Sequence, residues 1–448
     1  MTVPDRATAL FTRTLVVLAA LDVLLFGYLV AASSIRLPYW DMYTLLVRYL
    51  QYRVDGRWWA YVWAPHVQHH QVWMRLLTAF DVQLFAGSAY SFVIVTTIGQ
   101  VVTAWLLCRL AIAGGPRGFA LAKACLVVML VLTAVAAVDC AIPITGVYPQ
   151  TVLFAVLAFV LFDPEGPPGT GGRHLSGRRI AALAAAIGAG FGNAAALGVW
   201  PILAWLAWRA GAGRTWIAAA VAAGALFIAV YVSDLPLNAQ PAAGSSGSAI
   251  ARLGDALDYL LIYMGLPVTR AAALALPGKA LGAALLLASL AVVAWLGFLK
   301  TRVDRTARIA VALILFSLAT AVLAAVGRVD IPDVSGVKVP VRYTVFLAPL
   351  HVGLLLAAGP LLGRWWSAPR SRLAVQAGAV AMASVLLVLH LGIGRAAVAT
   401  SRSMTATIRQ FMRGERTPEM TRVIYHDLDQ AQRDLDTIRA AGLLVNVE

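Results

Sequence analysis

The sequence contains few charged residues. Only 13% of its 448 positions are Asp, Glu, Lys or Arg, whereas a soluble globular protein carries roughly 25%. Hydrophobic residues make up 60% of the chain. This composition excludes an ordinary soluble protein and indicates a protein whose surface is mostly in contact with lipid.

Cysteine and acidic residues are also scarce. The three thiols, Cys108, Cys125 and Cys140, lie in or beside apolar segments and form no CxxC pair, so neither a disulfide framework nor a zinc site is indicated. Lys and Arg outnumber Asp and Glu by 36 to 21, giving a net charge of +15. Because the basic residues are scattered between hydrophobic runs, we expect no nucleic-acid partner. The positive charge is instead typical of a membrane protein, in which Lys and Arg mark the cytoplasmic connections and attract anionic lipids.

Long apolar runs are abundant by contrast. Several reach the roughly 18–20 residues that a helix needs to cross about 30 Å of hydrocarbon, and only helices satisfy their own backbone polar groups in lipid. We therefore predict an all-α membrane protein with about 11 transmembrane helices. The predicted spans are residues 14–32, 90–112, 119–138, 148–163, 180–195, 197–209, 215–232, 280–299, 307–326, 344–362 and 373–392. The stretch "GFGNAAALGVWP" within 180–209 predicts a tight turn or a kink.

The connections between these runs predict an orientation. With the N-terminus inside, every short inner connection is basic, whereas the short outer ones "DCAIPITGVYPQ" and "GFGNAAALG" contain no Lys or Arg. This pattern predicts a multi-pass membrane protein with a cytoplasmic N-terminus and an external C-terminus. The high content of Ala, Gly, Arg and Val suggests a GC-rich bacterial genome, so the expected location is a bacterial plasma (inner) membrane. Residues 1–392 form the predicted membrane domain and 393–448 an outer helical tail. Within the first outer loop, 33–89, the spacing predicts interfacial helices.

Ionisable groups cluster in this first outer loop. Asp41 stands beside Tyr39 and Trp40 in "PYWDMY", just after the first span. A carboxylate at the outer rim suits a general base acting on a hydroxyl, and the aromatic rings suit stacking on a sugar. The alternative is that Asp41 caps the helix that follows, a role compatible with catalysis.

A histidine-rich stretch, "APHVQHHQVWMR", follows about 25 residues later. Its spacing predicts that His66, His69 and His70 share one helical face, with Gln68, Gln71 and Arg75 extending the polar surface. Neutral His and Gln side chains can orient sugar hydroxyls. A metal site is the alternative, but no fourth ligand is evident, so we predict none.

A second set of candidates lies late in the chain, on the same predicted side. Arg328, Lys338, Arg342 and Tyr343 occur around "VKVPVRYT". Arginine is suited to bidentate contact with phosphate, so Arg342, with Arg328 and Lys338, is a candidate phosphate site. An interfacial anchor is the alternative for Arg342. At the membrane centre charge is almost absent, and Asp22, near the middle of the first span, is the main exception, without an evident partner.

The order of these features resembles the GT-C superfamily, polytopic glycosyltransferases that use lipid-linked sugars on the outer or lumenal face. An early acid in a long first outer loop, here "PYWDMY", and an outer soluble tail carry the resemblance. A bacterial group of that superfamily has an Asn-Glu-His-Arg-like stretch in this loop; here it is Val67-Gln68-His69-His70, and only His69 matches. "VRYT" at 341–344 is similar to the Arg-Tyr pair that begins a late span in such proteins.

The resemblance implies a function. Asp41 would be catalytic, and a sugar would move from a polyprenyl-phosphate donor to a cell-envelope glycan, lipid or protein acceptor in one inverting displacement. Arg342 would hold the leaving phosphate. Some relatives bind a divalent cation, but no acidic pair here requires one. The alternatives are a transporter or flippase, or an assembly partner, for lipid-linked envelope glycans. The sugar and the acceptor are not specified by the sequence.

Overall fold

The computed structural model describes residues 6–66, 69–113, 115–163, 177–235, 249–266, 268, 275–328 and 339–444. In these ranges the chain is almost wholly helical and contains no β-sheet; the one β-bridge joins His66 and His69. The predicted all-α class is therefore confirmed.

The elements follow one another along the chain, with η marking 3₁₀ turns except for η5, which is a π-helical turn. They are α1 (Arg6–Ser33), α2 (Asp41–Asp55), α3 (Trp58–Trp63), α4 (Val72–Phe85), α5 (Tyr90–Ile112), α6 (Arg117–Val131), α7 (Ala134–Ala141), η1 (Pro143–Thr145), α8 (Val147–Phe162), α9 (Gly177–Gly190), η2 (Ala194–Gly198), α10 (Val199–Arg209), α11 (Arg214–Val232), α12 (Ala249–Met264), α13 (Ala275–Val292), η5 (Val293–Leu299), α14 (Arg305–Arg328), η6 (Val341–Leu347), α15 (Ala348–Ser367), α16 (Pro369–Met412), α17 (Met420–Val423) and α18 (Leu428–Ala440).

Within the described residues, eight helical segments are long and apolar enough to cross a membrane. They are Thr8–Ser33, Tyr90–Ile112, Pro143–Phe162, Arg214–Val232, Ala275–Leu299, Arg305–Gly327, Val341–Ser367 and Pro369–Met412. The bent pair α6 and α7 makes a ninth if it is counted as one span. The chain is thus a multi-pass membrane protein by the length and composition of its helices.

The remaining predicted spans fall on short helices. α9 has 14 residues and packs along α8, and the apolar segment Ala194–Arg209 packs against α11 and α14. The expected tight turn is present between them, where the Asn193 side chain accepts a hydrogen bond from the Ala195 amide at 2.8 Å and starts η2. At about 1.5 Å per residue, α9 is shorter than the hydrocarbon layer is thick.

The predicted span 119–138 is not one straight helix. α6 ends at Val131, and the chain bends by 46° before α7. The Thr133 hydroxyl accepts a hydrogen bond from the Ala136 amide at 3.1 Å and so caps a new helix.

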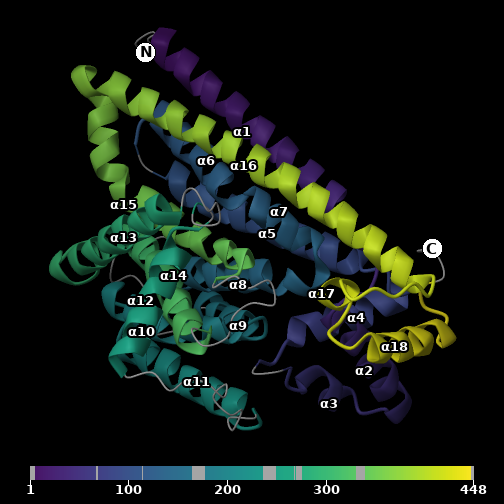
Figure 1. The fold of residues 1–448 in the computed structure, drawn as a ribbon. Helices are drawn as coiled ribbons and strands as arrows, with labels where there is room; N and C mark the ends of the chain where they lie inside the picture. Colours follow the sequence, from purple (N-terminus) through teal and green to yellow (C-terminus); the bar gives the residue numbers. More distant parts are fainter. Residues whose placement is uncertain are drawn as a thin grey trace.

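The helices form an elongated bundle with two different ends (Figure 1). At one end lie the N-terminus and the junction of α15 with α16, together with the basic connections after α5, α10 and η5; we call it the basic end. At the other end lie α2, α3, α4, α17 and α18, which we call the loop end. The first-loop candidates that the structure describes, among them Asp41, His66 and His70, lie at the loop end.

α1 and α16 run side by side along the length of the bundle (Figure 1). They approach closely at Gly394, where a Cβ atom would come within 2.7 Å of Leu29. On the same interface His390 Nδ1 lies 2.7 Å from Asp22 Oδ1, and both side chains are buried. The expectation that Asp22 stands alone is wrong, because its partner is 368 residues away in sequence.

The C-terminal tail does not begin where the sequence predicted. α16 continues without interruption from Pro369 to Met412, so the expected boundary at 392/393 falls inside a helix. The tail then packs on the first loop, because Ile424, Leu435 and Ile438 share one hydrophobic core with residues of α2 and α4. First loop and tail therefore form one structural unit at the loop end.

Candidate functional site

Asp41 is the first residue of α2, and Trp40 occupies the N-cap position without a side-chain cap bond. The prediction that Asp41 caps the helix is thus wrong. Its carboxylate nevertheless lies in the first turn of the helix, at the positive end of the helix dipole. The side chain is 44% exposed, so it is accessible to another molecule.

Trp40 holds the start of α2 in an unusual conformation. Its φ of +47° is rare for a bulky residue, and three contacts with the tail retain it. The Trp40 amide donates to the Ile424 carbonyl at 2.6 Å, the indole N–H donates to the Arg422 carbonyl at 3.2 Å, and the ring meets Tyr425 edge-on. These contacts connect the start of α2, and with it Asp41, to the tail, and the predicted stacking of the Trp40 ring on a sugar stays a prediction.

His66 is the partner of Asp41. His66 Nε2 lies 3.1 Å from Asp41 Oδ2, and the His66 side chain is only 12% exposed. Two backbone hydrogen bonds to His69, of 2.7 and 3.0 Å, fix its position. When this imidazole donates to Oδ2, Oδ1 remains to accept from a hydroxyl group.

The three histidines do not share a helical face, and that prediction is wrong. α3 ends at Trp63 and α4 begins at Val72, and the described residues between them, 64–66 and 69–71, are not helical. Pro65 explains the interruption, since proline disfavours helical backbone at the residue before it and cannot donate a helical hydrogen bond. The predicted site residue Gln68 lies outside the described residues.

His70 is fully buried and connects the first loop to the end of α11. Its Nδ1 is 2.6 Å from the Trp63 carbonyl, and its Nε2 is 3.0 Å from the Tyr231 carbonyl and 3.1 Å from Asp234 Oδ1. The ring also stacks on Trp63, with centroids 4.4 Å apart. Since both ring nitrogens already contact protein oxygens, this geometry gives His70 a structural role and not the predicted substrate contact.

Tyr39 is likewise buried beside Asp41, with 2% of its surface exposed and no hydrogen-bond partner for its hydroxyl among the described residues. Burial, with a smaller contribution from the Asp41 carboxylate, raises the pKa of Tyr39 well above its ordinary value. The phenol therefore remains a neutral donor whose hydrogen has no acceptor in the described part of the chain.

The late candidates lie in and before η6. Arg342 interacts electrostatically with Asp139 of α7, a carboxylate that is 2% exposed. Tyr343 is buried in an aromatic group with Tyr148 and Phe346, at centroid distances of 5.8 and 6.4 Å. Arg342 is therefore already partly compensated within the protein.

The other two predicted cations cannot be placed in the site. The side chain of Arg328, at the end of α14, and the whole of Lys338 lie outside the described residues. Asp139 was missed from the sequence. The only signal for it was a lone acid at the loop end of an otherwise apolar segment, "AVAAVDCAIP".

The two groups of candidates belong to the same end of the bundle. The Ile35 amide, just before the Asp41 turn, donates to the carbonyl of Ala141 at the end of α7. α7 in turn packs against η6, which carries Arg342. Tyr148 packs against two hydrophobic cores, the one between the spanning helices and the one shared by the first loop and the tail.

Arg75 is buried, although the sequence predicted that it extends the polar surface of the histidine-rich stretch. It is fully buried in α4, and its three guanidinium nitrogens have no hydrogen-bond acceptor among the described residues. Its charge lies over the Tyr61 ring, 5.3 Å from the centroid. Burial lowers the pKa of Arg75, and the nearby Arg48 charge adds to this effect. The loop thus holds two close positive charges that the sequence analysis did not use.

Over the described residues, no group of three His, Cys, Asp or Glu side chains is placed to hold a metal ion. The expectation that the site needs no metal stays a prediction.

Comparison with known proteins gives no relative: no family model, no curated protein and no solved structure matches the chain.

Proposed function

We propose that the protein is a membrane glycosyltransferase of the GT-C type. It transfers a sugar from a polyprenyl-phosphate donor to a cell-envelope acceptor at the loop end, which faces the outside of a bacterial plasma membrane. The proposal includes the N-terminus inside, and it counts α9 and α10 with the spanning helices to give eleven. The single observation that carries it is the Asp41–His66 pair, an accessible carboxylate with a fixed imidazole partner at the membrane rim.

In this mechanism Asp41 is the general base. Its free carboxylate oxygen takes the proton of an acceptor hydroxyl while that oxygen attacks the anomeric carbon. The new glycosidic bond forms as the bond from the anomeric carbon to the phosphate oxygen breaks, and the electron pair leaves with the phosphate. The configuration at the anomeric carbon is inverted. His66 positions the carboxylate by donating a hydrogen bond to it.

Arg342 is the proposed stabiliser of the leaving phosphate. It lies at the mouth of a long apolar helix, α15, where the headgroup of a lipid-linked sugar would sit. A preorganised cation favours the charge that develops on the phosphate in the transition state. Because Asp139 balances part of the charge of Arg342, the net field at this point is weaker than that of a lone arginine.

The experiment is a transfer assay with purified protein in nanodiscs, using a panel of polyprenyl-phosphate sugars and a glycan acceptor mixture. Asp41→Asn should lower turnover by about 10² or more while donor binding is retained. Asp55→Asn is the matched control, because Asp55 ends the same helix and its side chain is similarly exposed, at 43%. Transfer by Asp41→Asn at the wild-type rate would remove Asp41 from the mechanism.

A second candidate is a transporter or flippase for lipid-linked envelope glycans. One observation favours it: Asp22 and His390 contact each other at 2.7 Å within the spanning helices α1 and α16, where ionisable groups often serve transport. Movement of a labelled polyprenyl-phosphate sugar across proteoliposomes, lost in Asp22→Asn and retained in Asp41→Asn, would favour this candidate over the enzyme.

A further inference from the structure

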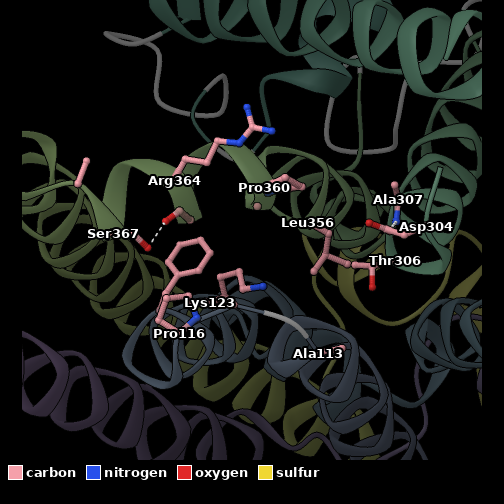
Figure 2. Close-up of a pocket in the computed structure, with 15 residues that line it drawn as sticks. Ala113, Pro116, Lys123, Asp304, Thr306, Ala307, Leu356, Pro360, Arg364 and Ser367 are labelled. Atoms are coloured by element: carbon pink, nitrogen blue, oxygen red, sulfur yellow. Dashed lines mark hydrogen bonds between the residues drawn. The ribbon is translucent and has the colours of Figure 1, made fainter. Parts of the chain in front are cut away.

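A cavity of about 700 Å³ opens at the basic end, opposite the candidate site (Figure 2). Its walls are the connection after α5, the first turns of α6 and α14, and the last turns of α15. Most of the lining is apolar or small. The polar side chains in it are Lys123, Asp304, Thr306, Arg364 and Ser367.

Lys123 is the central feature of this cavity. The residue is only 6% exposed, yet its ammonium group makes no hydrogen bond or ion pair among the residues that the structure describes. Its contact is with the face of the Phe119 ring, 5.0 Å from Nζ to the centroid. Figure 2 shows the side chain extending from α6 into the space below α15. Nζ is not among the fully buried unpaired atoms, so it is open to the cavity, where the oxygens of a ligand can accept hydrogen bonds from its three donors.

The carboxylate in the lining does not fill that role. Asp304 Oδ1 accepts a hydrogen bond from the Ala307 amide at 2.8 Å and so caps α14. It acts on Lys123 only as a more distant charge. Arg364 adds a second cation at an exposed position on the other wall. Two cations and one carboxylate leave the cavity with a positive charge.

The surroundings indicate a lipid as the occupant. Residues next to the lining expose large apolar side chains, Ile112 at 54% and Leu361 at 49%, beside spans that cross the hydrocarbon. Acyl chains can lie along such residues while a headgroup enters the cavity. Basic pockets between spanning helices are known binding places for anionic headgroups.

We propose that this cavity binds the phosphodiester headgroup of an anionic membrane phospholipid, with its phosphate oxygens accepting hydrogen bonds from Lys123. The site is separate from the proposed glycosyltransferase centre and goes beyond it. Phosphate is the shared chemistry, and the apolar walls favour the lipid over a free phosphate ester.

The test is native mass spectrometry of the full-length purified protein, titrated with phosphatidylglycerol, phosphatidylcholine or inorganic phosphate. Wild-type protein should retain one phosphatidylglycerol in preference to phosphatidylcholine. Lys123→Met keeps the length and apolar stem of the side chain while removing its charge, so the fold should tolerate it. It should weaken phosphatidylglycerol binding by about tenfold or more. Lys300→Met, a change at an exposed position of the same end, is the matched control and should bind as wild type does.

A second variant tests the cavity itself. A Cβ atom at position 359 would lie 3.9 Å from Lys123 Nζ, in ordinary contact, so Gly359→Leu fills the space and leaves the charge. It should also reduce lipid binding. Equal binding by wild type and both cavity variants would overturn the proposal. Saturation of wild type by inorganic phosphate, with no preference for phosphatidylglycerol, would overturn the assignment to a lipid. Because no sugar transfer is measured, failure of the proposed enzyme activity does not affect this result.

Discussion

At the scale of single residues, three histidine–aspartate pairs in the described chain lie in three environments. In His390–Asp22 both side chains are at most 6% exposed, in His70–Asp234 only the aspartate is exposed, and in His66–Asp41 both have some exposure. Exposure separates their roles, since a ligand can reach only a pair with free surface. Asp234 and Asp41 are about equally exposed, at 45% and 44%, but only in the third pair is the imidazole exposed as well, at 12%, on a residue that the backbone bridge to His69 holds in place.

The buried pair gives a prediction about stability. His390→Leu leaves Asp22 without a partner among apolar side chains, which should lower the free energy of unfolding by about 1–3 kcal/mol. Replacing both residues by leucine should restore stability to near the wild-type value, because no polar group is then left unpaired. Thermal unfolding in detergent measures both effects. A double variant as unstable as the single one would contradict this account of the pair.

The sequence singled out both Asp41 and His66 as candidates but did not predict that they contact each other. The end of the first hydrophobic run placed Asp41 at the membrane rim. Its partner His66 is 25 residues away, and the contact depends on the non-helical backbone at residues 64–66, which helical spacing does not describe. Asp22 illustrates the same limit, because its partner lies at the other end of the chain and no local pattern marks it.

At the scale of elements, hydrophobic runs predicted the helices well and their ends less well. All eleven runs coincide with helices, but α9, with 14 residues, and α10, with 11, are shorter than the helices that can cross a membrane. α16 extends about 20 residues beyond its predicted end at 392. Hydropathy falls there, but no proline interrupts the chain, and helical backbone requires only that its own hydrogen bonds continue.

The tail's contact with the first loop gives a prediction at this scale. Trp40→Phe keeps an aromatic ring but removes the indole donor to the Arg422 carbonyl, so it should lower stability by about 1 kcal/mol. If Asp41 is catalytic, transfer should fall as well, because the start of α2 is less well held. Trp59→Phe is the control, since Trp59 lies in the same loop and is 77% exposed. Calorimetry measures stability without depending on tryptophan fluorescence, and identical melting of the two variants would argue against the contact.

At the scale of the whole molecule, the charge pattern predicts which end faces the cytoplasm. A cysteine-free background is obtained by replacing Cys108, Cys125 and Cys140 with alanine. Ala440→Cys, exposed on α18, should react in intact cells with a membrane-impermeant maleimide. Thr301→Cys, exposed at the basic end, should react only after the membrane is permeabilised. The reverse pattern would place the Asp41–His66 pair on the cytoplasmic face and exclude an external glycosyl acceptor.

α16 is one continuous helix that connects the two ends of the molecule and fixes their separation and relative rotation. Its 44 residues begin directly after Ala368, in the lining of the basic-end cavity, and end where the tail folds back to Trp40. At about 1.5 Å per residue this is one rod of roughly 66 Å. Inserting a single residue into a helix turns everything beyond it by about 100°, so the two ends are locked in rotational phase. An insertion or deletion of one residue in α16 would therefore rotate the tail away from its contact with the first loop. The number of residues between Pro369 and Met412 must be kept for that contact to form.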